Sequence, residues 1–383
     1  MRVLRWATHQ LVFALAFLGG VTSARPTNAG DWRDTSPHRV RRIKTAPDVT
    51  LEVLDWGGRG PTVVLLAGMG TTAHIYDDFA PKLAHGFHVW GITRRGFGAS
   101  SQPGSGYDPT TLAADVLHVL DVLEVQRACL VGHSLAGEEI TEIAANHPER
   151  VDKVVYLDAA YDLSKFLEFM QENPWPHLDP PTPADQATPS AMLDWEERAF
   201  GYRRPEADLR ATTVFGPHGY ERDVTEDSSP VFRSIIAGFK KEPYDKVQAP
   251  ALAIFAVPTG AADLFPHRYA SMDTASQAAA RKMAEATAQR AETASRQFLQ
   301  SVAHGQVLKI LGASHYVFLS NEKHVLGAVR DFLRPAEGQV LGRDGLAPES
   351  QGHGSDDRVL GDHAVGVRHV DRAKSTGKAH GSS

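Results

Sequence analysis

One serine of this 383-residue chain stands where a side chain can become a nucleophile. Ser134 lies in the hexapeptide GHSLAG at 132–137, which follows an apolar run at 128–131 and precedes an amphipathic segment. A strand that turns sharply into a helix needs very small residues two places before and two places after the corner, and Gly132 and Ala136 meet this need. The corner pushes the serine hydroxyl out above the sheet. The hexapeptide therefore predicts a nucleophilic serine between a strand and a helix.

A histidine near the end of the chain could activate this serine. A serine hydroxyl is a poor nucleophile at neutral pH, so it needs a base within hydrogen-bonding reach. His315 follows the last apolar run, at 307–311, and precedes the final amphipathic segment, at 321–333. Where the chain order is serine, acid, histidine, this loop holds the base. We therefore expect His315 to accept the proton of Ser134.

Two aspartates are candidates for the carboxylate that orients the imidazole. Asp158 ends the apolar run after the serine corner, and neighbouring parallel strands would bring it beside Ser134 at one edge of the sheet. Asp263 follows the next strand, at the end of a longer loop. The sequence favours Asp158 and leaves Asp263 open as the alternative acid. If Asp263 is the acid, Asp158 is a structural residue at the end of its strand.

Attack on a carbonyl group creates a negative oxygen that needs two N–H donors. The serine corner offers the backbone N–H of Leu135. The second donor is expected in the glycine-rich turn AGMG at 67–70, where we favour the N–H of Met69. Turns of this kind also bind phosphate, but this one has neither the GxGxxG pattern nor a P-loop lysine. The turn therefore favours an oxyanion hole.

Short apolar runs alternate with longer segments of helical period, which is typical of a parallel sheet flanked by helices. The expected strands are residues 51–56, 62–66, 88–92, 128–132, 154–157, 251–256 and 307–311. The expected helices between and after them are residues 75–84, 111–123, 135–146 and 321–333. The alternation predicts one α/β core made of residues 48–160 and 245–334.

Several stretches break the alternation. Residues 161–244 combine prolines, aromatic residues and short helical patterns without a strong strand, so they are expected to form an insertion. Residues 268–302 are rich in alanine and favour a long surface helix packed on the core. We expect a polar leader at 25–47 and, because apolar periodicity is lost there, a disordered tail at 335–383.

The segment 1–24 has the features of a signal peptide. Arg2 and Arg5 precede an apolar stretch at 11–21 that is too short to span a bilayer, and small residues follow at 22–24. The mature chain would then begin near Arg25 and be secreted or periplasmic. An uncleaved anchor formed by the same apolar stretch is the alternative.

Composition restricts the expected partners. A net charge of −6 with 22% charged residues provides no basic surface for nucleic acid. Cys129 is the only cysteine, so no disulfide framework or thiolate metal cluster can form within one chain. We expect a small-molecule substrate, no cofactor, no metal, no nucleic acid and no membrane contact beyond the export signal. The sequence does not determine the oligomeric state.

The motifs together resemble the α/β-hydrolase fold family over about residues 49–333. They are LLAGMG from Leu65, TRRGFGAS from Thr93, GHSLAG from Gly132, YLDAA from Tyr156 and GASHYVFLS from Gly312. The resemblance implies a mostly parallel central sheet flanked by helices, with a helical cap at 161–244. It also implies the roles of nucleophile for Ser134, base for His315 and oxyanion donors for Met69 and Leu135. In this family the acid follows either of the two strands after the serine, so Asp158 and Asp263 both remain candidates.

Three positions depart from the family pattern. Ala136 replaces the second glycine of the serine motif, Ala67 stands where the oxyanion loop usually has histidine, and Thr93 stands where an aspartate is often found. None of these changes removes a catalytic atom. The expected function is a capped, carboxylesterase-like serine hydrolase acting on a small, largely apolar ester or related acyl compound through an acyl-enzyme intermediate. Aminopeptidase, lactonase and carbon–carbon hydrolase activities remain open, as does a non-catalytic binding protein that kept the fold.

Overall fold

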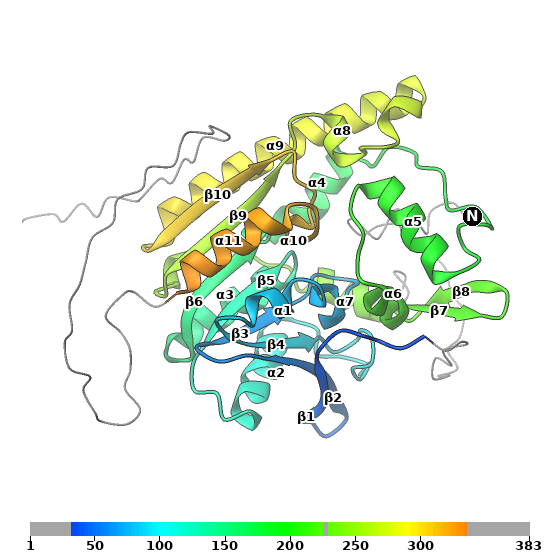
Figure 1. Cartoon of the computed structure of the whole chain (residues 1–383). Coiled ribbons are helices and arrows are strands. Elements are labelled where there is room, and N and C mark those ends of the chain that lie inside the picture. Colours follow the sequence, from blue (N-terminus) through cyan, green and yellow to red (C-terminus); the bar gives the residue numbers. More distant parts are fainter. Residues whose placement is uncertain (1–31, 226–228, 335–383) are drawn as a thin grey trace, which may run out of the picture.

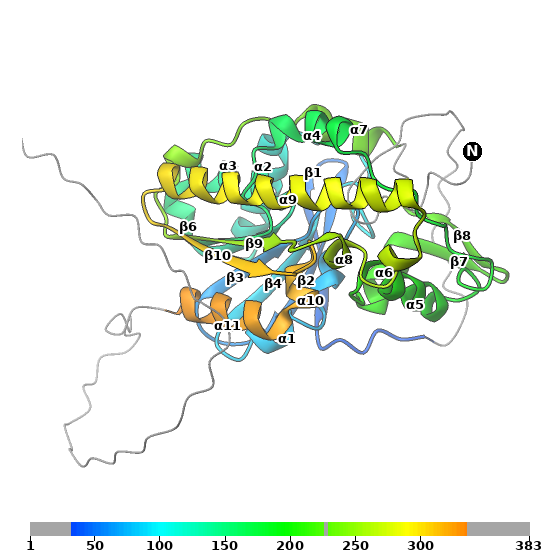
Figure 2. The same cartoon turned by 90° about the horizontal axis from the view of Figure 1, so that it is seen from above.

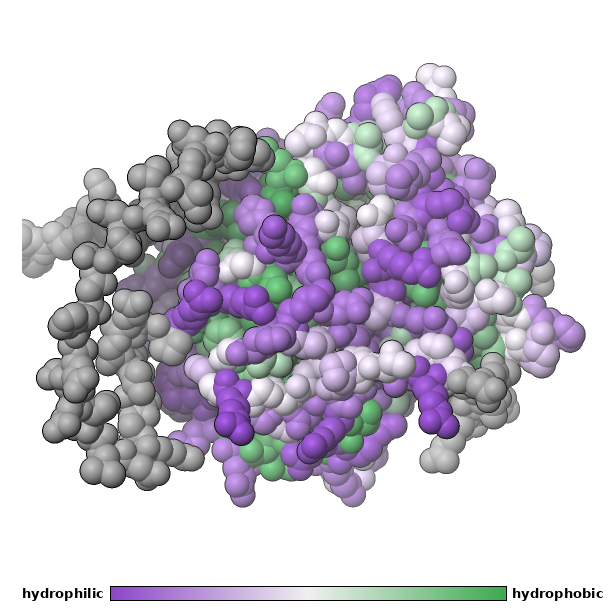
Figure 3. Space-filling model, in the orientation of Figure 1, coloured by the Kyte–Doolittle hydropathy of each residue, from purple (hydrophilic) through white to green (hydrophobic). Residues whose placement is uncertain are grey.

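The computed structural model describes residues 32–225 and 229–334 (Figure 1). The predicted signal peptide, the beginning of the predicted polar leader and the predicted disordered tail lie outside these residues. Within the described residues, no helix is both long and apolar enough to span a membrane. The face drawn in Figure 3 is mainly hydrophilic, with small and separate hydrophobic areas.

A mostly parallel sheet of eight strands forms the centre of the molecule, in the order β1-β2-β4-β3-β5-β6-β9-β10. Strands β2 and β4 pair antiparallel. From β4 onward, the strands β4, β3, β5, β6, β9 and β10 all run parallel to one another. The bounds are β1 Arg39–Ala46, β2 Val49–Gly57, β3 Thr62–Leu66, β4 His88–Thr93, β5 Ala128–His133, β6 Val151–Leu157, β9 Ala251–Val257 and β10 Gly305–Leu311. Every strand expected from the sequence is present. The predicted α/β fold class is confirmed.

Strand β1 corrects the prediction of a polar leader over residues 25–47. It pairs antiparallel with β2 and forms one edge of the sheet. Only Ile43 of this strand is buried, because an edge strand with one solvated face needs few apolar residues. Its sequence, RVRRIKTA, therefore lacks the apolar run that identified the other strands.

Helices cover both faces of the sheet (Figure 2). One face carries α2 (Pro109–Val122), α3 (Ala136–Asn146) and α9 (Thr274–Ser301), and the other carries α1 (Ala80–Leu83), α10 (Val317–Ser320) and α11 (Glu322–Leu333). The helix expected at 75–84 is instead a 3₁₀ turn, η2 (Ala73–Tyr76), followed by α1. Pro81 suits the first turn of the new helix α1, and its nitrogen has no hydrogen to donate to a carbonyl group of the preceding turn.

The inserted segment is mainly helical but also contains a hairpin that the sequence did not predict. Its elements are η4 (Leu163–Lys165), α4 (Phe166–Glu172), α5 (Pro189–Phe200), α6 (Glu206–Thr212), β7 (Thr213–Gly216), β8 (Gly219–Asp223) and α7 (Pro230–Ala237). The strands β7 and β8 have only four and five residues, and Gly219 supplies the positive φ that their tight turn needs. We call residues 161–244 the cap segment.

Two apolar clusters lie on the two faces of the sheet and form the core. One includes Leu83 of α1 and Val325 and Val329 of α11, and the other includes Val116 of α2 and Phe298 of α9. The remaining short elements are η3 (Pro148–Arg150), η5 (Tyr244–Lys246), α8 (Ala261–Leu264) and η6 (Tyr269–Ser271). The long helix α9 packs on β9 and β10, as expected for a surface helix with one buried face.

Candidate active site

Ser134 occupies a strained corner between β5 and α3. Its φ angle is +54°, in the left-handed region that a residue with a side chain rarely adopts. A Cβ atom on Gly132 would lie 2.9 Å from the carbonyl oxygen of Ala136, and one on Gly137 would lie 2.2 Å from that of Ala159. Small residues on both sides of the serine are thus required by close packing of backbone against backbone. The structure contains the corner that the hexapeptide predicts.

The loop after β10 brings His315 against Asp158. Their Nδ1 and Oδ2 atoms are 2.6 Å apart, and the carboxylate is buried. The other oxygen, Oδ1, accepts hydrogen bonds from Tyr161 Oη at 2.6 Å and from the backbone N–H of Ala256 at 3.0 Å. Three donors therefore fix the carboxylate, and the carboxylate in turn fixes the proton of the imidazole on Nδ1.

Asp263 occupies a different environment. It lies in α8, and its Oδ2 accepts hydrogen bonds from the backbone N–H and the hydroxyl of Thr259, both at 2.7 Å. These bonds stabilise the loop in which Asp263 itself lies. Of the two candidate acids, the structure brings Asp158 to His315 and leaves Asp263 outside that contact.

The turn at 67–70 lies beside the serine. A Cβ atom on Gly68 would be 3.1 Å from the Cβ of Ser134 and 2.8 Å from Nδ1 of His133, so only glycine fits this approach. Met69 and Leu135 line the same cavity as Ser134. Among the described residues, no group accepts a hydrogen bond from the backbone N–H of either one. Both N–H groups are thus available to a ligand.

A buried arginine that was not predicted braces this turn. Arg94 donates to the carbonyl oxygens of Ala67 at 2.7 Å and Gly68 at 3.2 Å, and it forms an ion pair with Glu139 of α3. It thereby ties the turn that holds Met69 to the helix that starts at the serine corner. The sequence analysis identified the motif TRRGFGAS that contains Arg94, but a single sequence does not show that this side chain points inward.

A second buried histidine supports the loop of His315. His133 Nε2 lies 3.1 Å from the carbonyl oxygen of His315, and the two rings are 4.6 Å apart between centroids. Burial, and then the charge of His315, hold the pKa of His133 well below its usual range. His133 is therefore neutral and donates from Nε2. It positions the backbone of the loop without adding charge beside His315.

A cavity of about 1120 Å³, counted with its opening to solvent, adjoins these residues. Its walls are mainly apolar and come from three parts of the chain. The cap segment contributes Tyr161, Leu163, Phe166, Phe169, Trp175 and Phe239, the α9 helix contributes Met283, Thr287 and Arg290, and the core contributes Ser134, Asp158 and His315 among others. The contribution of α9 was not predicted, since the sequence pattern of that helix indicates only a packed surface element.

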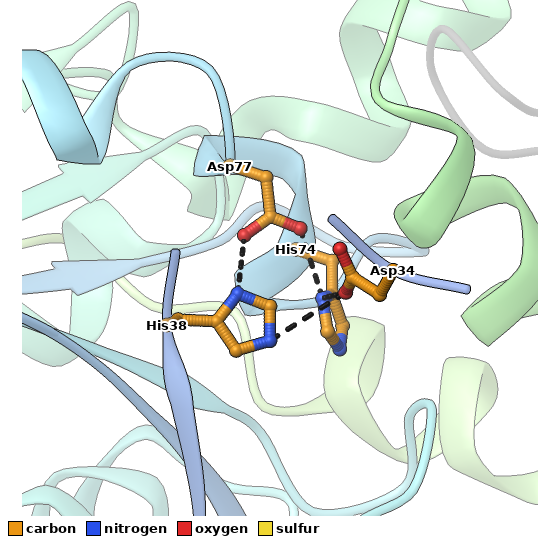
Figure 4. Close-up of side chains that lie close together, drawn as sticks. All are labelled: Asp34, His38, His74 and Asp77. Atoms are coloured by element: carbon orange, nitrogen blue, oxygen red, sulfur yellow. Dashed lines mark hydrogen bonds and ion pairs between the residues drawn. The ribbon is translucent and has the colours of Figure 1, made fainter. Parts of the chain in front are cut away.

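A separate group of histidines and carboxylates lies near the edge of the sheet (Figure 4). His38 Nδ1 and His74 Nδ1 contact the two carboxylate oxygens of Asp77 at 2.9 and 3.0 Å, and Asp34 lies within 3.5 Å of both imidazoles. Burial opposes a charge on His74, but hydrogen bonds and charges from Asp77 and Glu52 outweigh it and raise the pKa of His74 to about 10. We call these five residues the edge cluster.

Four residues of the edge cluster could also hold a metal ion. Asp34, His38, His74 and Asp77 each offer one ligand atom, and these atoms lie within 4.8 Å of one another. The same atoms already pair with each other as hydrogen bonds and ion pairs. A cation bound here would have to displace the proton of His74, and the hydrogen bonds and ion pairs among the four residues form without a cation.

Comparison with known proteins finds a family model and several relatives that match part of this chain. A family model described as "alpha/beta hydrolase fold" matches residues 61–214. A putative non-heme haloperoxidase of Mycobacterium phage D29 is 38% identical over 104 residues, which are 27% of this chain and 37% of that protein. A 2-(acetamidomethylene)succinate hydrolase of Mesorhizobium japonicum is 29% identical over 123 residues, 32% of this chain and 44% of that protein. The chain thus matches less than half the length of these curated relatives.

Solved structures match over a longer range. A probable hydrolytic enzyme from Pseudomonas aeruginosa superposes with a TM-score of 0.56 and 18% identity, covering 80% of this chain and 96% of that one. The crystal structure of E-2-(acetamidomethylene)succinate hydrolase gives a TM-score of 0.54 and 19% identity, covering 77% and 99%. At this level of identity the likeness concerns the fold. Together with the order of the strands in the sheet, these matches show that the chain has the α/β-hydrolase fold.

Proposed function

We propose that this protein is a serine hydrolase that cleaves an acyl compound through an acyl-enzyme intermediate. The observation that carries the proposal is that Ser134, on its strained corner, lines the same cavity as His315, whose imidazole is bonded to Asp158. A serine, an imidazole and a carboxylate in this relation are the parts needed for nucleophilic catalysis.

The reaction follows from the roles of these atoms. Ser134 Oγ bonds to the carbonyl carbon of the substrate while Nε2 of His315 takes the hydroxyl proton. The carbonyl electron pair moves to oxygen, which the N–H groups of Met69 and Leu135 stabilise. Collapse of this intermediate breaks the bond to the leaving group, which receives the proton from His315. A water molecule, deprotonated by His315, then attacks the acyl-enzyme, releases the acid and restores Ser134.

Asp158 is the acid in this proposal. Its charge opposes the positive charge that forms on His315, and its hydrogen bond keeps Nε2 free to accept the serine proton. The bonds from Tyr161 and Ala256 hold the carboxylate in place without neutralising it. Asp263 remains as the alternative acid for a direct test by mutation.

The walls of the cavity favour a small substrate that is largely apolar. Aromatic and aliphatic side chains of the cap segment make up much of its lining. The relatives carry names as different as haloperoxidase and succinate-derivative hydrolase, so they do not select one bond type for this chain. Lactone, peptide and carbon–carbon bonds are alternatives to an ester.

A panel of nitrophenyl esters of increasing acyl length tests the proposed function. We expect the protein to hydrolyse the shorter members at rates that exceed those of its Ser134→Ala variant by about 10³-fold or more. A binding protein that only kept the fold would show no difference between the two forms. The chain length at which activity falls reports the depth of the cavity.

We also propose that the protein is exported, from the charged and apolar pattern of residues 1–24. Intact-mass measurement after expression in a host with a secretory pathway is expected to give a chain that begins near Arg25. Recovery of a soluble cytoplasmic protein that retains Met1 would contradict export.

A further inference from the structure

An arginine of α9 lies in the cavity without a carboxylate partner. The Arg290 guanidinium stacks on the ring of Tyr161 at 4.6 Å and on that of Phe169 at 4.9 Å, and its side chain lines the same cavity as Ser134. Its Nη2 atom is buried, and no group within the described residues accepts a hydrogen bond from it. Arg290 also forms no ion pair with any of the described residues.

An unpaired cation of this kind is costly in an apolar wall. Burial lowers the pKa of Arg290, and the nearby Tyr161 and Asp158 offset the effect only in part. Arginine nevertheless stays charged at neutral pH, so its lost hydration must be compensated or tolerated. The two aromatic rings provide some compensation, but they leave the buried Nη2 group without a hydrogen-bond acceptor among the described residues.

The two aspartates whose charges act on Arg290, Asp158 and Asp162, accept hydrogen bonds from other groups. Asp158 receives hydrogen bonds from His315, Tyr161 and Ala256. Asp162, another nearby acid, accepts from the backbone N–H and the hydroxyl of Ser164. The protein therefore places a cation at the cavity, while the neighbouring aspartates accept hydrogen bonds from other groups.

A second unpaired donor lies in the same cavity. The indole Nε1 of Trp175 is buried without a hydrogen-bond partner within the described residues. Arg290 belongs to α9 and Trp175 to the cap segment, so two separate elements each place an unpaired donor at the cavity. Both are donors, which indicates an acceptor-rich and negatively charged ligand in place of a purely apolar one.

We propose that Arg290 binds a carboxylate of the substrate, so that the preferred substrate is a short acyl compound with a free carboxylate at a distance from the bond that is cleaved. The planar guanidinium can donate two parallel hydrogen bonds to a planar carboxylate. Tyr161 connects the two sites, since it stacks on Arg290 and bonds to Asp158. Because one side chain contacts both Arg290 and Asp158, we expect a short chain between the carboxylate and the reacting carbonyl. The claim that a bond of this substrate is cleaved rests on the proposed hydrolase function, whereas the claim that Arg290 binds a carboxylate does not.

Binding to a Ser134→Ala background separates the two claims, because it requires no turnover. Monomethyl glutarate carries the carboxylate, and methyl pentanoate is its neutral counterpart of equal acyl length. By calorimetry we expect monomethyl glutarate to bind about 10- to 100-fold more tightly, as for a hydrogen bond to a charged group. Equal affinity of the two compounds would overturn the proposal even if the enzyme hydrolyses both.

Mutation of Arg290 then assigns the preference to its source. Arg290→Gln in the same background should remove the preference for monomethyl glutarate and leave the affinity for methyl pentanoate within about twofold. Arg296→Gln is the matched control, since Arg296 is exposed on the same helix. It should leave the preference intact. Equal weakening of both ligands by Arg290→Gln would instead show that Arg290 only supports the packing of Tyr161 and Phe169.

Discussion

Two regions of this molecule pair histidine with aspartate, and they differ in what surrounds the pair. In the cavity, one imidazole meets one carboxylate at 2.6 Å, and a serine lines the same space. In the edge cluster, two imidazoles meet Asp77 at 2.9 and 3.0 Å, with Asp34 beside them (Figure 4). Glu52 lies 3.8 Å from Nε2 of His74. The distances are similar, so a close histidine–aspartate contact alone does not identify a catalytic site.

The charge balance distinguishes the two regions. The edge cluster has more carboxylates than imidazoles, and it holds His74 as a cation with its pKa raised to about 10. A histidine that is always protonated at neutral pH cannot accept a proton from a serine. No residue of the edge cluster is among those that line the cavity. We therefore propose that the pair in the cavity takes part in catalysis and that the edge cluster contributes to stability.

The largest expected effect follows from removing the reacting groups of the cavity. Ser134→Ala and His315→Ala should each lower ester turnover by at least about 10³-fold, and the double variant should be no worse than either one. The stability of Ser134→Ala should stay within about 1 kcal/mol of wild type. Steady-state kinetics and denaturant unfolding measure the two quantities. Additive losses would contradict a serine and a histidine that work as one unit.

Matched amide substitutions of the acids sharpen the comparison. Asp158→Asn should lower kcat by about 10³- to 10⁴-fold, because it favours the wrong imidazole tautomer and removes the opposing charge. Asp263→Asn should cost less than about tenfold. The reverse ranking would make Asp263 the acid and Asp158 a structural residue.

Asp77→Asn applies the same change to the edge cluster and should have the opposite profile. We expect the free energy of unfolding to fall by about 3 kcal/mol, because buried imidazoles lose their paired charge. The kcat of the folded variant should remain within about threefold of wild type. A loss of kcat comparable to that of Asp158→Asn, in a protein that remains folded, would show that the two regions do not divide their roles in this way.

The pH dependence of stability provides the smallest effect. Since the pKa of His74 is raised to about 10, the stability that its charge contributes is fully present below about pH 6.5 and is lost as the pH rises toward 10. Denaturant unfolding should show that the free energy of unfolding falls by up to about 1.4 kcal/mol for each pH unit in this interval. His74→Gln should flatten the decline, and His85→Gln, at an exposed position, should not.

The sequence predicts the elements that carry strong local patterns. The apolar runs of β3, β5 and β9 and the hexapeptide around Ser134 identify buried strands and a tight corner, because burial and close packing restrict those residues directly. The edge strand β1 was missed because only Ile43 needs to be apolar there. Local pattern thus locates the sheet and the corner but not its exposed edge.

The parts of the site that depend on contacts between distant residues could not be predicted from the sequence. Asp158 and Asp263 follow successive strands and could not be separated until the loop of His315 was placed against one of them. Arg94 and Arg290 resemble surface arginines in the sequence, and their inward orientation depends on which elements pack over them. Polar residues that turn toward a cavity leave no periodic signal of their own.

Labelling with a fluorophosphonate probe tests the central claim most directly, since the probe reacts with an activated serine and needs no knowledge of the substrate. Peptide mapping by mass spectrometry should find one adduct, on Ser134, and labelling should become much slower in Asp158→Asn but not in Asp77→Asn. An unlabelled protein that is folded, or an adduct on any other serine, would contradict the account.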